Sequence, residues 1–101
     1  MNKIRILVVD DEPQIRRTLR AALAPWGYAV TDAPSGEAAL VSLLESKPDL
    51  ILLDLNMPGM GGLALQDELM ARGVTLPIIV ITAYAEVSMA VRALKSGAVD
   101  F

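Results

Sequence analysis

The sequence predicts an α/β protein whose parallel sheet is covered by helices on both faces. Short aliphatic segments near residues 4–9, 28–32, 50–54 and 77–82 alternate with stretches in which apolar residues recur at helical spacing. The third and fourth segments are continuous aliphatic runs, which are typical of strands buried on both faces. Strands joined by helices in this order form parallel sheets with right-handed crossovers.

The composition fits one globular domain spanning residues 1–101. Of the 101 residues, 53% are hydrophobic and 21% are charged, which is enough apolar material for a core. The net charge of -3 predicts no general attraction to nucleic acid or to an anionic membrane. No apolar run approaches the roughly 20 residues of a membrane span, and no signal peptide precedes the first strand. We therefore expect a cytoplasmic protein.

Cysteine and histidine are both absent. Their absence excludes disulfides, thiolate metal sites, a cysteine nucleophile, a Ser-His triad and most zinc sites. Chemistry must then use carboxylates, hydroxyls and lysines. If a metal binds, hard oxygen ligands favour Mg²⁺ or Ca²⁺.

The first strand, Ile6-Leu7-Val8-Val9, ends in a group of acids, Asp10-Asp11-Glu12, directly ahead of Pro13. Proline at the first helical position is favoured, and acids before it offset the positive end of the helix dipole. Capping explains one acid, whereas three neighbouring acids repel one another unless a cation or solvent relieves them. A cation site is favoured, and capping stays open as the alternative.

The first helix is expected over residues 14–24, with Pro25-Trp26-Gly27 at its end. Trp26 is expected to close the end of this helix against the core. Three arginines fall on its polar side, and a solvated face is favoured over a basic patch because no aromatic residues lie between them. They are Arg16, Arg17 and Arg20.

Ser35 is a predicted cap for the second helix, which closes before Pro48. The next strand, residues 50–54, stops at Asp54, where a binding role and simple capping of the following turn are about equally favoured. The glycine-rich stretch that follows, residues 58–62, lacks both the phosphate-loop and the dinucleotide-binding patterns.

A third helix is expected to end at Gly73, and the fourth strand stops at Thr82. A fourth helix over residues 86–96 is expected to end at Gly97, and a further strand begins at residues 98–101. No internal repeat appears.

Parallel strands end on one rim of a sheet, so the topology brings four polar residues together: Asp10, Asp11, Asp54 and Thr82. A divalent cation is the simplest way to neutralise the three carboxylates. Asp54 beside such a cation can attack phosphorus and form an aspartyl phosphate, and the hydroxyl of Thr82 can hydrogen-bond a phosphoryl oxygen. These residues compose a coherent phosphoryl-transfer site.

Four groups of residues, spread over the whole chain, match the motifs of one protein family. They are Val8-Val9-Asp10-Asp11-Glu12, Asp54-Leu55-Asn56-Met57-Pro58 with Gly62, Ile81-Thr82-Ala83, and Lys95-Ser96-Gly97-Ala98 with Asp100-Phe101. In these motifs and their joint spacing, the sequence closely resembles the receiver domain of two-component response regulators. The resemblance implies a doubly wound, flavodoxin-like (βα)5 fold. Within the family, its overall character resembles that of receivers of transcriptional regulators.

The resemblance also implies roles for the site residues. It makes Asp54 the phosphoacceptor and Asp10 and Asp11 the acids that hold Mg²⁺, with Asp54 and the backbone carbonyl of Asn56 as further ligands. The phosphoryl donor would be a sensor histidine kinase.

Two further positions match the family's switch residues. Thr82 would move to meet the phosphoryl group, and Phe101 would change rotamer with it. A plain core aromatic is the alternative for Phe101. Tyr84 and the side chain of Asn56 occupy positions that tune how long the phosphoryl group lasts.

One departure concerns a lysine that the family places on the loop after the fifth strand, beyond Phe101. The given sequence stops before it, and before most of the last strand and the last helix. Without that ammonium, phosphorylation would slow by on the order of 10²-fold or more. The apolar strand at residues 78–81 would be left at a sheet edge, which favours homo-oligomers.

The sequence therefore predicts a signalling switch and not an enzyme with turnover, with its output domain or partner outside this chain. Two alternatives stay open. One is a non-phosphorylated interaction module or assembling receiver fragment. The other is a Mg²⁺ phosphohydrolase with an Asp nucleophile, although such enzymes usually have an acid where this chain has Asn56.

Overall fold

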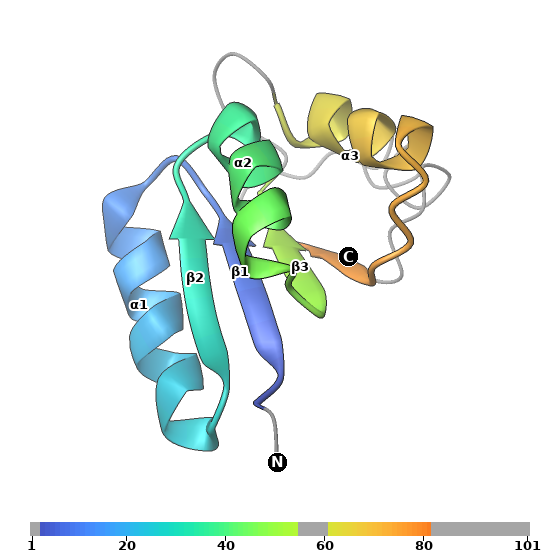
Figure 1. Ribbon diagram of the computed structural model, residues 1–101. Coiled ribbons are helices and arrows are strands. Elements are labelled where there is room, and N and C mark those ends of the chain that lie inside the picture. The colour runs from blue at the N-terminus through green and yellow to red at the C-terminus, as the bar shows by residue number, and fades with distance from the viewer. Residues whose placement is uncertain (1–2, 55–60, 82–101) are drawn as a thin grey trace.

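The computed structural model describes residues 3–54 and 61–81. Within them, the strands form one parallel sheet in the order β2-β1-β3-β4 (Figure 1). Their bounds are Arg5–Val9 for β1, Ala29–Ala33 for β2, Leu50–Leu53 for β3 and Ile78–Val80 for β4. The predicted α/β parallel-sheet fold is confirmed. The helix predicted over 86–96 and the strand predicted at 98–101 lie outside the described residues, and the single-domain boundary stays a prediction.

The described helices connect these strands. They are α1 (Pro13–Leu23), followed by the 3₁₀ turn η1 (Ala24–Trp26), then α2 (Gly36–Ser46) and α3 (Gly62–Ala71). Pro13 opens α1, where its missing N–H costs nothing. The predicted Ser35 cap is present, because its Oγ accepts a hydrogen bond from the Ala38 N–H at 3.1 Å. Local sequence therefore sets where these two helices begin. None of the described helices combines the length and apolar character needed to cross a bilayer.

One face of the sheet carries the main core. Leu7 lies opposite Ile51, and Ile51 lies opposite Ile78, so their side chains share a face. This face packs against α2 and α3, and α2 lies in front of the sheet in Figure 1. The buried core residues are Leu7, Val9, Ala33, Ala39, Ile51, Leu53, Leu65, Leu69, Ile78 and Val80.

The opposite face packs on α1. Asp32 alternates with the core residue Ala33, so it points to this second face, where it pairs with two arginines of α1. Ile6 and Val8 are buried here, but Leu50, Leu52 and Ile79 are only half-buried. The prediction that β3 and β4 are buried on both faces is therefore wrong for the α1 face. Among the described elements, α1 makes its main contacts with β1 and β2.

Trp26 does not close the end of α1 against the core, so that prediction is wrong. Its side chain is 81% exposed. The 3₁₀ turn η1 carries the chain past the end of α1, and Gly27 then turns it into β2 with a φ of 90°, a left-handed conformation that suits glycine. This turn leaves the indole on the outside of the molecule.

The edge position of β4 is relevant to the predicted self-association. Among the described residues, β4 pairs with β3 alone. Self-association through this strand stays a prediction.

The core assignment predicts that Leu7→Ala destabilises the protein by about 2–5 kcal/mol, because it removes a fully buried side chain and leaves a cavity. Urea unfolding measures this difference. Leu44→Ala is the matched control, because the Leu44 side chain on α2 is 76% exposed. Its expected effect is within about 0.5 kcal/mol. Equal losses in the two variants would contradict the assigned core.

Candidate functional site

Two strand ends place the acids. The backbone N–H of Asp10, just past β1, donates to the carbonyl of Ala33 at 3.1 Å. The N–H of Asp54, just past β3, donates to the carbonyl of Val9 at 2.9 Å. The sheet therefore holds the backbone of both acids at its carboxyl-terminal rim, where parallel α/β sheets bind ligands.

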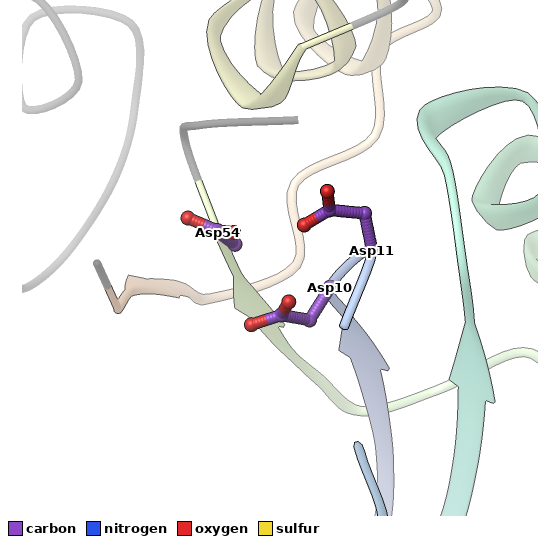
Figure 2. Close-up of side chains that lie close together, drawn as sticks. All are labelled: Asp10, Asp11 and Asp54. Carbon is purple, nitrogen blue, oxygen red and sulfur yellow. The ribbon is translucent and has the colours of Figure 1, made fainter. Parts of the chain in front are cut away.

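Three carboxylates meet at this rim. One oxygen from each of Asp10, Asp11 and Asp54 lies within 4.8 Å of the others. Figure 2 shows the three side chains extending to the same side of the ends of β1 and β3. Asp10 is buried, Asp54 is 9% exposed, and Asp11 is the most exposed of the three. Two unit charges at such a distance repel by roughly 3 kcal/mol at an effective dielectric constant of about 20.

This crowding changes the acidity of Asp10. Burial is the largest cause that raises the pKa of its carboxyl above the ordinary value of 3.8, and the charges of Asp54, Asp11 and Glu12 raise it further. A hydrogen bond from the Glu12 N–H acts in the opposite direction. Asp10 therefore holds a proton more readily than a solvated aspartate does.

The capping alternative accounts for part of Asp10. Its Oδ1 accepts the Glu12 N–H at 2.9 Å, so one carboxylate oxygen supports the turn into α1. Glu12 itself occupies the N-cap position without a side-chain cap bond. Local capping does not explain why the carboxylate of Asp54, from a different strand, lies beside those of Asp10 and Asp11.

The donor set fits a hard divalent cation. Mg²⁺ is held in proteins by one or two carboxylates and keeps several waters or substrate oxygens as its other ligands. The cluster offers three carboxylates, and a chain without histidine or cysteine offers no imidazole or thiolate ligand. Asp10, Asp11 and Asp54 are the described residues that could hold this ion.

The remaining predicted site residues lie outside the described residues. These are Asn56, Thr82 and Phe101, together with Tyr84. The backbone N–H of Ile81 donates to the carbonyl of Leu53 at 2.8 Å, so the described chain leads to this same rim one residue before Thr82.

Sequence reasoning missed Arg16, which it assigned to a solvated helix face. The Arg16 side chain is only 16% exposed, and its Nη1 donates to the backbone carbonyl of Asp10 at 2.8 Å. Its Nε lies 3.6 Å from Oδ2 of Asp32. The sequence did contain a signal for this contact. Asp32 lies at the end of the second strand, within reach of an arginine in the second turn of the preceding helix.

A family model described as the response regulator receiver domain matches residues 6–101. This chain belongs to the response regulator receiver domain family. The resemblance stated from the sequence is thereby confirmed.

Known relatives agree with this assignment. The receiver domain is 42% identical over 97 residues to the regulatory protein AtoC of Escherichia coli (strain K12) and 44% identical over 99 residues to the transcriptional regulatory protein ZraR of Salmonella typhimurium. These alignments cover 96% and 98% of this chain but only 21% and 22% of the relatives. The chain thus spans about a fifth of the length of these relatives.

Solved structures show the same fold. A response regulator receiver protein from Pseudomonas putida superimposes with a TM-score of 0.94 at 31% identity, covering 100% of this chain and 85% of that one. The FixJ-N structure gives a TM-score of 0.89 at 39% identity, covering 100% of this chain and 81% of that one. The flavodoxin-like receiver fold inferred from the motifs is confirmed.

The raised pKa of Asp10 predicts a pH dependence of stability in the metal-free protein. Because the folded state binds this proton more tightly than the unfolded state, the contribution of Asp10 is fully present below 3.8 and is lost as pH rises through the folded pKa. At neutral pH, Asp10→Asn should therefore be more stable than the wild type, because the amide removes a buried charge that the neighbouring carboxylates repel.

Urea unfolding in EDTA, from acid to neutral pH, measures this difference. Asp67→Asn removes an exposed carboxylate on α3 and is the control. A wild type that gains stability over Asp10→Asn as the pH rises would contradict the assigned direction.

Proposed function

We propose that this receiver domain accepts a phosphoryl group on Asp54, with Mg²⁺ held beside it by Asp10, Asp11 and Asp54. The observation that carries the proposal is the convergence of three carboxylates, within 4.8 Å, at the carboxyl-terminal rim of a parallel sheet. Membership of the receiver family supports phosphoryl transfer as the chemistry of this rim.

In the proposed reaction, a carboxylate oxygen of Asp54 attacks the phosphorus atom of the donor. A P–O bond to Asp54 forms while the donor's bond to phosphorus breaks, and its electron pair leaves with the donor atom. Asp54 is suited to this role because its backbone is fixed by the hydrogen bond to Val9 and its side chain faces the other acids. When bound, Mg²⁺ would neutralise the carboxylates and the phosphoryl oxygens.

The proposal also assigns roles to three residues outside the described ranges, because they occupy positions in the matching motifs. Asn56 would give its backbone carbonyl to the metal. Thr82 would donate its hydroxyl to a phosphoryl oxygen, and Phe101 would follow Thr82 as the switch aromatic. The alternative of a plain core position for Phe101 stays open.

The proposed phosphoryl donor is a phosphohistidine of a sensor histidine kinase, so the bond that breaks is P–N. Because the chain spans about a fifth of relatives that include a transcriptional regulatory protein, we propose that it works within a longer regulator of transcription. In that setting, it is a switch and not an enzyme with turnover. The predicted cytoplasmic location and the absence of direct nucleic-acid binding by this domain stay predictions.

The first prediction of this proposal is that incubation with Mg²⁺ and a small-molecule phosphodonor adds one phosphoryl group to the protein. Asp54→Asn should gain none, because an amide lacks the nucleophilic carboxylate oxygen. Intact mass spectrometry measures the gain.

Asp67→Asn is the matched control, since it makes the same substitution at an exposed site, and it should be phosphorylated like the wild type. A phosphoryl group on Asp54→Asn would place the acceptor elsewhere. No gain in any variant, with a correctly folded wild type, would favour the non-phosphorylated interaction module or assembling fragment. Continuous turnover of a generic phosphate ester would instead favour the phosphohydrolase alternative.

The second prediction is that Mg²⁺ stabilises the folded protein. At a concentration of about 100 times its Kd, it should add roughly 2.7 kcal/mol to the free energy of unfolding, because it binds the native state alone. EDTA should reverse the gain, and Asp11→Asn should lose most of it. Thermal unfolding with and without the metal measures both effects, and equal Mg²⁺ responses in wild type and Asp11→Asn would contradict the assigned ligands.

A further inference from the structure

Arg16 connects the acidic rim to a different strand. From the second turn of α1, its Nη1 donates to the Asp10 carbonyl at 2.8 Å, while its Nε lies 3.6 Å from Oδ2 of Asp32 in β2. Arg20, one helical turn later, approaches Oδ1 of the same Asp32 at 3.2 Å. The guanidinium of Arg16 is thus held between β2 and the chain that leaves β1.

The bond to the Asp10 carbonyl acts on a particular peptide unit. That carbonyl belongs to the peptide that joins Asp10 to Asp11, so its direction sets the ψ angle of Asp10 and the φ angle of Asp11. The N–H of Asp10 is already fixed by Ala33, and its Oδ1 by the N–H of Glu12. Arg16 supplies a further restraint on how the two carboxylates lie relative to one another.

The ion pairs of Asp32 with Arg16 and Arg20 are better suited to holding the Arg16 side chain in one orientation than to stabilising the fold. Asp32 and Arg20 are one-third and one-half exposed, and ion pairs at such exposure contribute little free energy. The Arg16 side chain, in contrast, is 16% exposed, and a planar guanidinium can hold two acceptors in fixed directions. Asp32 therefore serves to orient Arg16.

We propose that Arg16 is a positioning residue that fixes the Asp10–Asp11 peptide and so sets the geometry in which the two acids bind Mg²⁺. This inference rests on the proposed function for the identity of the metal. Partners that orient metal ligands typically contribute 10-fold to 100-fold in metal affinity. Arg16 would act through the backbone carbonyl of Asp10, to which its Nη1 donates, and not as a ligand of the metal.

The sign of the effect separates positioning from simple charge. Removing a cation near an acidic cluster should strengthen the binding of a divalent cation if Arg16 acted only through its charge. Removing a positioning residue should weaken it. The two roles thus predict opposite changes in the same measurement.

The test is a calorimetric titration of Mg²⁺ into Arg16→Met, which keeps the aliphatic stem and removes the donors and the charge. We expect the Kd to rise about 10-fold or more. Arg17→Met, which removes the same charge from an exposed position on the same helix, should bind Mg²⁺ at least as tightly as the wild type. Arg16→Lys, whose ammonium can still donate to the carbonyl, should recover part of the lost affinity.

A second readout needs no metal. Hydrogen exchange of the Glu12 amide, which bonds to the Asp10 side chain, should accelerate in Arg16→Met and not in Arg17→Met. If Arg16→Met lowers the melting temperature while its Kd and Glu12 exchange match the wild type, Arg16 is merely structural and the proposal is wrong. Tighter Mg²⁺ binding by Arg16→Met would also overturn it. A wild type that does not bind Mg²⁺ would instead refute the proposed metal, and the exchange measurement would still decide whether Arg16 holds this peptide.

Discussion

The site depends on the register of β1, which pairs with β2 on one side and with β3 on the other. Val9 lies opposite Ala33 of β2 and opposite Leu53 of β3, so the residues after each strand emerge at one level. A slip of one residue would turn Val9 away from the core and separate Asp10 from Asp54. Such a slip is costly because Leu7, Val8 and Val9 are completely buried. Hydrophobic burial on the two faces of one strand therefore fixes the position of a polar site that contributes nothing to the core.

The acids at the carboxyl-terminal rim of the sheet destabilise the fold that hydrophobic burial stabilises. Three carboxylates lie close together there, and burial and the neighbouring acids disfavour the charged form of Asp10 in the folded state. The core can tolerate this cost because each large buried side chain stabilises by a few kcal/mol, comparable to the repulsion of one such pair. The same repulsion makes the rim attractive to a divalent cation. Poor stability of the metal-free site and affinity for a cation thus have one physical cause.

The sequence was sufficient to predict the strands, a helix start and the position of the acids, because the signals for these features are local or periodic. Aliphatic runs located β1, β2, β3 and β4 to within a residue or two, Ser35 marked the start of α2, and the alternation of strands and helices placed Asp10, Asp11 and Asp54 at one rim. The sequence did not predict the burial of side chains whose neighbours are distant in the chain. Whether Leu52 is buried depends on which helix covers β3, and whether Arg16 is solvated depends on Asp32 in another strand. The 3₁₀ turn that exposes Trp26 likewise has no periodic signal.

The exposed indole has a practical consequence. Trp26 is the only tryptophan of the chain, and it lies where η1 leads into β2, at the amino-terminal end of the sheet, opposite to the acidic rim. Its intrinsic fluorescence therefore comes from a chromophore that is already in water and distant from the carboxylates. Quenching of that fluorescence by an ion bound at the rim is not expected. A shift toward shorter emission wavelength would instead signal that another surface has covered this end of the molecule, so the native chain contains an optical probe for contacts at the end opposite to its chemistry.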